Sequence, residues 1–143
     1  MKYLFAALVL IASGCASSPV STSAATIASA TNIYSPETFV ADPQKGEIVL
    51  VRDSSFGGKC ALGVYLDGKL VAAIEREQKL VMYVTPGDHI IGAGPNPNGG
   101  GVCNWFSDQM RREVSFSAAA GKQLKYRLAM VSGQISIMPT AFD

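Results

Sequence analysis

The chain of 143 residues has almost no net charge and a single histidine, and each shortage argues against a class of function. Lys and Arg number 12 and Asp and Glu number 11; without Lys2, which lies in the leading segment, the balance is 11 − 11 = 0. A neutral chain has no long-range electrostatic field that would gather nucleic acid. The composition therefore predicts that nucleic acid is not a partner.

His89 is the one residue on which a histidine-based reaction could depend. Its neighbour Asp88 points to the opposite face if the two lie on a strand, so an Asp–His pair from these two residues is disfavoured. The chain also has no Gly-x-Ser-x-Gly nucleophile elbow. We expect His89 to be a strand residue beside a turn, and we expect a protein without catalytic residues that is not an enzyme.

The N-terminus has the pattern of an export signal. Lys2 precedes a nine-residue apolar run, 3–11, which is too short to span a bilayer core of roughly 30 Å. Small residues follow and lead directly to Cys15. An ordinary secretory signal is one interpretation, but a cysteine at this position resembles the lipobox of bacterial lipoproteins, in which the thiol receives a diacylglyceryl group. The lipobox most often has Leu three places before the cysteine, where this chain has Ala12.

The resemblance to lipoproteins implies that residues 1–14 are a signal peptide and that Cys15 is the lipidated first residue of the mature chain. Several buried acyl chains anchor a protein durably, at about 0.8 kcal/mol for each CH₂ group. Ala16, rather than Asp, follows the cysteine. By the sorting preference of enterobacterial lipoproteins, this implies the outer membrane.

The remaining cysteines, Cys60 and Cys103, are expected to form a disulfide because an exported protein meets an oxidising compartment. Two buried free thiols are the alternative. Two cysteines and one histidine do not make a structural zinc site, which usually takes four ligands in close-spaced pairs. We predict neither a metal nor another cofactor.

The segment 15–44 is rich in Ser, Thr and Ala, which predicts a flexible tether with a reach of roughly 30 Å. From residue 45 to residue 143 the pattern changes to short apolar runs separated by turn signals such as Asp67-Gly68 and Pro86-Gly87. No helical period of useful length is present. The expected strands are 46–53, 60–67, 69–75, 80–85, 88–94, 112–117, 122–131 and 134–139. This order predicts a small, all-β, antiparallel sandwich of the immunoglobulin-like kind.

The turns of this domain are similar to those of a family of small bacterial lipoproteins of unknown function, related to the PEGA-type β-sandwich. The shared pattern consists of an Asp-Gly hairpin, an aromatic strand that leads into Pro-Gly-Asp-His, and Ala-Gly-Lys before a Tyr-containing strand. In this chain it comprises Asp67, Gly68, Tyr83, Pro86, Gly87, Asp88, His89, Ala120, Gly121, Lys122 and Tyr126. The resemblance covers residues 46 to about 138 and implies an exported, membrane-tethered β domain with no known catalytic residue.

The run 92–103, GAGPNPNGGGVC, is the most unusual local feature. Glycine-rich loops can cradle phosphate, but Pro95 and Pro97 remove backbone donors here and no helix is expected to follow. A loop fixed by a disulfide at Cys103 is the plain interpretation. A contact loop for a protein or carbohydrate is the functional one, with four candidate contact residues: Asn96, Asn98, Asn104 and Trp105. Trp105 is alternatively a core aromatic.

These observations together predict a lipoprotein anchored in the outer membrane and facing the periplasm. We expect a non-catalytic accessory or protein-interaction module of the cell envelope, whose protein partner the sequence does not identify. The alternative is an envelope glycan-binding module that uses the loop 95–106.

Overall fold

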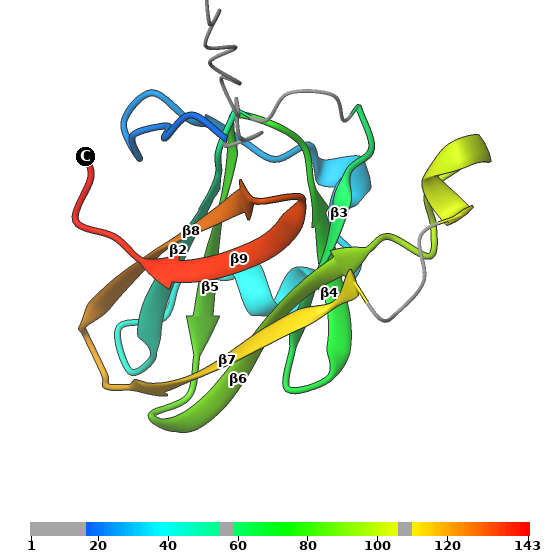
Figure 1. The fold of residues 1–143 in the computed structure, drawn as a ribbon. Coiled ribbons are helices and arrows are strands. Elements are labelled where there is room, and N and C mark those ends of the chain that lie inside the picture. Colours follow the sequence, from blue (N-terminus) through cyan, green and yellow to red (C-terminus); the bar gives the residue numbers. More distant parts are fainter. Residues whose placement is uncertain (1–16, 55–58, 106–109) are drawn as a thin grey trace, which may run out of the picture.

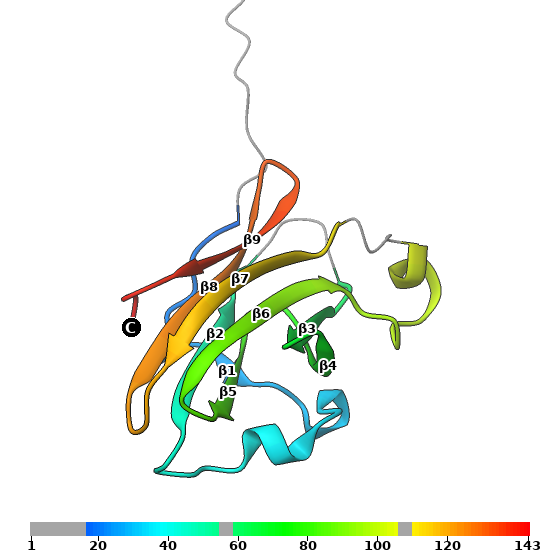
Figure 2. The same ribbon diagram turned by 90° about the horizontal axis from the view of Figure 1, so that it is seen from below.

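The computed structural model describes residues 17–54, 59–105 and 110–143, and these form two β-sheets packed face to face (Figures 1 and 2). The first sheet has the strand order β1-β5-β2-β8-β9 and the second has the order β4-β3-β6-β7. The bounds of the first sheet are β1 Thr26–Ile27, β2 Gly46–Arg52, β5 Gln78–Val84, β8 Gln123–Val131 and β9 Gln134–Pro139. Those of the second are β3 Leu62–Leu66, β4 Lys69–Ile74, β6 Gly87–Pro95 and β7 Arg112–Ala118. The all-β sandwich is confirmed.

Strand β2 lies at the centre of the first sheet because it is apolar on both faces. Six of its seven residues are buried. It pairs antiparallel with β5, where Leu50 lies opposite Leu80, and parallel with β8, where Leu50 lies opposite Tyr126. The parallel pairing makes this sheet mixed rather than purely antiparallel. It also places the carboxyl ends of β2 and β8 at the same end of the sandwich.

The turns follow the sequence signals. Asp67 and Gly68 both have positive φ, 49° and 82°, and join β3 to β4 as a tight hairpin. Gly87 has φ 132° where β5 turns into β6. These are conformations in which Gly, Asn and Asp are favoured over bulky side chains. All eight strands expected from the sequence are present, as β2 to β9.

The core lies between the sheets and draws on both. Ile48, Leu50 and Met82 of the first sheet and Val64 and Ile91 of the second are fully buried and belong to one apolar cluster. Buried residues alternate with half-buried ones along β5 and with exposed ones at the end of β7, so that one face of each strand is directed to this core. Side chains from strands far apart in the sequence therefore share one interior.

The flexible tether expected for residues 15–44 is wrong for the part that the structure describes, 17–44. Strand β1 pairs with β5, and two short 3-10 helices, η1 (Ala30–Asn32) and η2 (Pro36–Phe39), follow it along the sandwich (Figure 2). Ala25, Ala28 and Ser35 are buried, and Ile33 and Phe39 pack against the core. The low charge and small side chains of this segment suit close packing on a sheet as well as disorder, and tertiary contacts decided between them. Residues 1–16, including Cys15, lie outside the described residues.

Candidate functional site: a disulfide-closed loop

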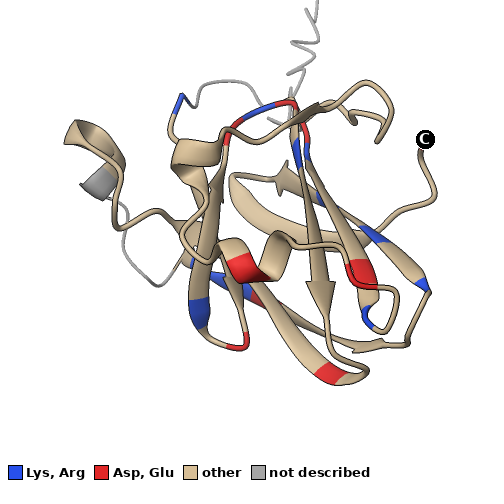
Figure 3. Ribbon diagram, turned by 180° about the vertical axis from the view of Figure 1, so that it is seen from behind, with Lys and Arg blue, Asp and Glu red and all other residues tan. Residues whose placement is uncertain are grey.

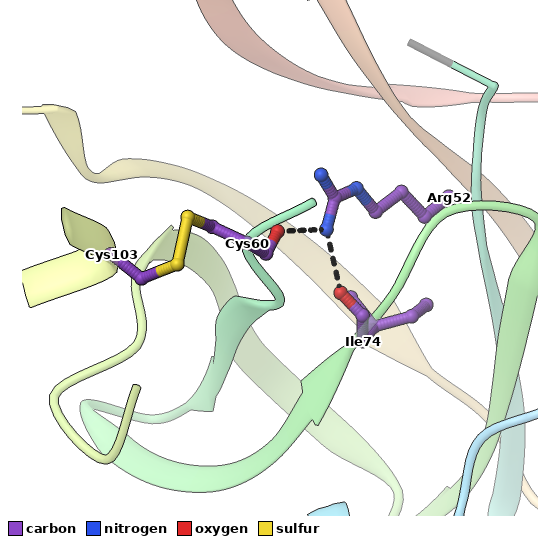
Figure 4. Close-up of a disulfide and its surroundings, with 4 residues drawn as sticks. All are labelled: Arg52, Cys60, Ile74 and Cys103. Atoms are coloured by element: carbon purple, nitrogen blue, oxygen red, sulfur yellow. Dashed lines mark hydrogen bonds between the residues drawn. A yellow bond between two sulfur atoms is a disulfide. The ribbon is translucent and has the colours of Figure 1, made fainter. Parts of the chain in front are cut away.

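Cys60 and Cys103 form a disulfide with a Cα–Cα distance of 5.4 Å, as expected (Figure 4). Cys60 lies two residues before β3, and Cys103 lies in η3, a 3-10 helix at Gly101–Trp105. The bond ties the segment after β6 back to the second sheet. We call residues 96–105 the disulfide loop; in Figure 1 it stands out from the side of the sandwich.

The buried side chain of Arg52 holds the Cys60 end of this bond. Its Nη1 donates to the carbonyl oxygens of Cys60 and Ile74, each at 2.8 Å (Figure 4). Burial, together with a smaller effect of the positive charge of Arg76, lowers the pKa of Arg52 to about 10, and the negative charge of Glu75 opposes this change. Arg52 therefore stays charged at neutral pH, and its two charge-assisted hydrogen bonds fix the backbone next to the disulfide.

The amino-terminal end of the disulfide loop is held by two tyrosines. Tyr65 Oη donates to the Pro95 carbonyl oxygen at 3.1 Å, and Asn96 Nδ2 donates to Tyr34 Oη at 3.3 Å. Asn96 Oδ1 accepts the backbone N–H of Asn98 at 3.1 Å, which is an Asx-type turn. The loop is therefore attached to the body of the protein at both ends.

The four candidate contact residues do not share one role. Asn96 is only 6% exposed and its amide is used inside the protein, so the expectation of a surface contact there is wrong. Asn98 is exposed, as a contact residue requires. Asn104 and Trp105 belong to η3, but their side chains lie outside the described part of the structure. The predictions for these two residues, including Trp105 as a core aromatic, stay predictions.

Sequence analysis missed Val102 as an exposed residue of the same loop. This side chain is 66% exposed on η3 and lies next to the disulfide. An apolar residue in a Gly-rich run gives no signal of its own, because its exposure depends on the direction in which the loop leaves the sheet. The disulfide loop, which is attached to the sandwich at both ends, thus exposes the apolar side chain of Val102 and the amide of Asn98.

The glycines before the loop serve packing rather than phosphate binding. The guanidinium carbon of Arg111 lies 3.9 Å from the centre of the Tyr65 ring, and its Nη2 pairs with Glu113 Oε1 at 2.6 Å. A Cβ on Gly94 would come within 3.0 Å of Arg111 Cβ, and one on Gly92 within 3.2 Å of Glu113 Cγ. Small residues at these places allow the arginine to lie across β6.

His89 lies on β6 beside the turn, and both of its ring nitrogens have acceptors. Nδ1 is 2.7 Å from Asp67 Oδ2 and Nε2 is 2.8 Å from the Thr85 carbonyl oxygen. Because both partners are acceptors, only the protonated ring, in which each nitrogen donates, satisfies both contacts. Burial lowers the pKa of His89, but the bonds to Asp67 and Thr85 outweigh it and the net pKa is raised. A protonated histidine used in this way is a structural contact; Asp88 accepts a bond from Ser117 instead.

A second polar centre, which the sequence did not reveal, lies at the end of β2. Asp53 is 1% exposed and accepts hydrogen bonds from Ser17 Oγ and from Arg127 Nε, each at 3.1 Å, and it forms an ion pair with Arg127. The backbone N–H of Val20 also donates to it, at 3.3 Å. An acidic residue that ends an apolar strand is the only local signal of this role.

Among the residues that the structure describes, no group of three or more His, Cys, Asp or Glu side chains is arranged to hold a metal ion. Within the same residues, no helix has the length and apolar character needed to cross a membrane. Comparison of the chain with protein-family models, with curated proteins and with solved structures finds no match. The class of protein is thus defined by the structure alone: a two-sheet β-sandwich with a disulfide-closed loop.

Proposed function

We propose that this protein is a lipoprotein anchored through Cys15 in the outer membrane, and that its sandwich is a non-catalytic protein-interaction module in the periplasm. The observation that carries the proposal is the Cys60–Cys103 disulfide. Disulfides persist in oxidising compartments, which fits an exported chain. With these two cysteines joined, Cys15 is the odd thiol, and lipidation within the lipobox-like pattern accounts for it.

The disulfide loop is the proposed contact surface for a protein partner of the envelope. Both of its ends are tied to the body of the protein, so little ordering entropy is lost when it binds. Val102 supplies exposed apolar area, and Asn98 supplies an exposed polar group in the same loop. This combination is typical of a protein contact, in which an apolar centre has a polar rim.

The anchor is tested by the intact mass of the protein purified from membranes of a host that processes lipoproteins. The expected mass starts at Cys15, includes the added acyl chains and lacks two hydrogens for the disulfide. Fractionation of the two membranes then tests the outer-membrane location. An unmodified chain in the soluble fraction would contradict the proposal.

The contact surface is tested by a photoreactive amino acid placed at Val102 in intact cells. The matched control is Lys122, which is exposed in the turn between β7 and β8. We expect a discrete cross-linked protein from position 102 and none from position 122. Equal patterns at both positions would contradict a role for the loop. Retention on isolated cell wall that a Trp105→Ala change abolishes would instead indicate glycan binding.

A further inference from the structure

The described chain begins with a set of contacts that fix it to the sandwich, which we call the N-terminal clamp. Ser17 donates from its backbone to the Met130 carbonyl oxygen and accepts the Met130 N–H at its Oγ, both at 3.1 Å. Ser17 Oγ also donates to buried Asp53. Ser18 forms an antiparallel bridge with Ser54, with bonds of 2.7 and 3.1 Å. The backbone is therefore held in place from residue 17 onward.

Only Ala16 separates this clamp from Cys15. Two residues span at most about 7 Å even when fully extended. The headgroup layer on each side of a bilayer is itself about 5–7 Å thick. If Cys15 carries a lipid, the distance from the clamp to the acyl chains is therefore limited to about the thickness of the headgroup layer.

Strand directions define which end of the sandwich carries the clamp. Met130 is near the carboxyl end of β8, and Ser54 follows β2, which runs parallel to β8. The β8–β9 hairpin, with its turn at Ser132 and Gly133, lies at this end, and the blue start of the described chain runs beside it in Figure 2. Val131 on the hairpin is 47% exposed. Lys122, before the start of β8, lies at the opposite end, roughly 26 Å away along the strand.

The turn between β4 and β5, at the clamp end, carries charges of both signs. The turn between β4 and β5 lies there because β5 runs antiparallel to β2, and Figure 3 shows acidic and basic segments side by side on it. Lys59, Glu75, Arg76 and Glu77 line a cleft of about 430 Å³ next to it. Two cations and two anions give the lining of this cleft no net charge.

We infer that the clamp holds the sandwich directly on the bilayer, with the β8–β9 hairpin end in contact with phospholipid headgroups and the Lys122 end directed away. The inference rests on the proposed lipidation of Cys15. In this arrangement the domain has a fixed orientation relative to the bilayer and is not connected to it by a flexible tether. The disulfide loop leaves from the side of the sandwich (Figure 1), so its partner is met close to the membrane surface.

The orientation is tested with the full lipidated chain in phosphatidylcholine vesicles that contain a headgroup nitroxide quencher. A fluorophore is attached to Gln134→Cys, at the hairpin, or to the matched control Lys122→Cys; both positions are exposed. The introduced cysteine is the one free thiol, because the disulfide and the lipid block the others. We expect several-fold stronger quenching at position 134 than at position 122.

A second variant tests the cause. A flexible Gly/Ser linker of about 12 residues between Ala16 and Ser17, with a reach of roughly 19 Å, is expected to reduce the quenching at position 134 to the control level. Equal quenching at both positions of the protein without the linker, when it floats with the vesicles, would overturn the orientation and leave the anchor intact. A protein that carries no lipid by mass and does not float would refute the anchor and, with it, the orientation.

Discussion

Removal of the Cys60–Cys103 bond is predicted to destabilise the fold strongly. The two cysteines are 43 positions apart, and closing a loop of this length in the unfolded chain is worth about 4 kcal/mol in the chain-entropy model. For a folded unit of roughly 125 residues, with an unfolding entropy of about 2.1 cal/mol/K per residue, this corresponds to a fall in Tm of about 15 °C. Ser is a suitable replacement because both cysteines are only partly buried.

Urea denaturation of the Cys60→Ser, Cys103→Ser and double variants measures this effect. The three are expected to lose nearly the same free energy of unfolding, since either change alone breaks the bond. The m-value is expected to rise, because the unfolded chain becomes less compact when the cross-link is absent. A loss below about 1 kcal/mol in the double variant would refute the loop-closure argument. Arg52 and the tyrosines would then hold the disulfide loop without help from the bond.

Three further predictions concern a core residue, the buried ion pair and the histidine beside the β5–β6 turn. Leu50→Ala, at a fully buried position of β2, is expected to lower the free energy of unfolding by about 2–5 kcal/mol. The measurement is a lower urea midpoint at constant m-value. A smaller loss would show that the core closes around the gap. Asp53→Ala is expected to cost about 3–5 kcal/mol because it leaves Arg127 without its buried partner. A double-mutant cycle with Arg127→Met should show a large coupling energy. Losses of unfolding free energy that simply add would argue against an interaction between the two side chains. Because the pKa of His89 is raised above its ordinary value of 6.5, its contribution to stability is complete below pH 6.5 and is lost as the pH rises through the raised pKa. The unfolding free energy of the His89→Gln variant should therefore depend less on pH above pH 6.5 than that of the unchanged protein. An unchanged pH profile would exclude the contact with Asp67 as the cause of the pH dependence.

Local chemistry in the sequence was sufficient to predict the strands and turns. The apolar run of β2 predicted a central strand, and Asp67-Gly68 predicted the hairpin with two positive φ values. Cysteine arithmetic predicted the Cys60–Cys103 bond. Each of these signals depends on residues within one short segment or on a count, and such signals are legible before any tertiary contact exists.

The candidate site was predicted less well because burial decides the role of each residue in it. Asn96 was expected at the surface, but its amide is hydrogen-bonded inside the protein, whereas Val102 was overlooked and is exposed. Nothing in the local sequence distinguishes a surface asparagine from one that closes an Asx turn under a tyrosine 62 residues away.

The sequence by itself determined the sandwich class and its hairpins and favoured the pairing of two cysteines, because periodicity, turn residues and cysteine count are properties of the chain alone. Only the tertiary structure decided the course of residues 17–44. That segment has the composition of a tether, yet Asp53, Ser54 and Met130 supply hydrogen-bonding partners for its first residues, and β5 supplies a strand edge for β1. The free energy that orders it comes from groups distant in the sequence, and the composition of a segment contains no information about partners that only the fold brings to it.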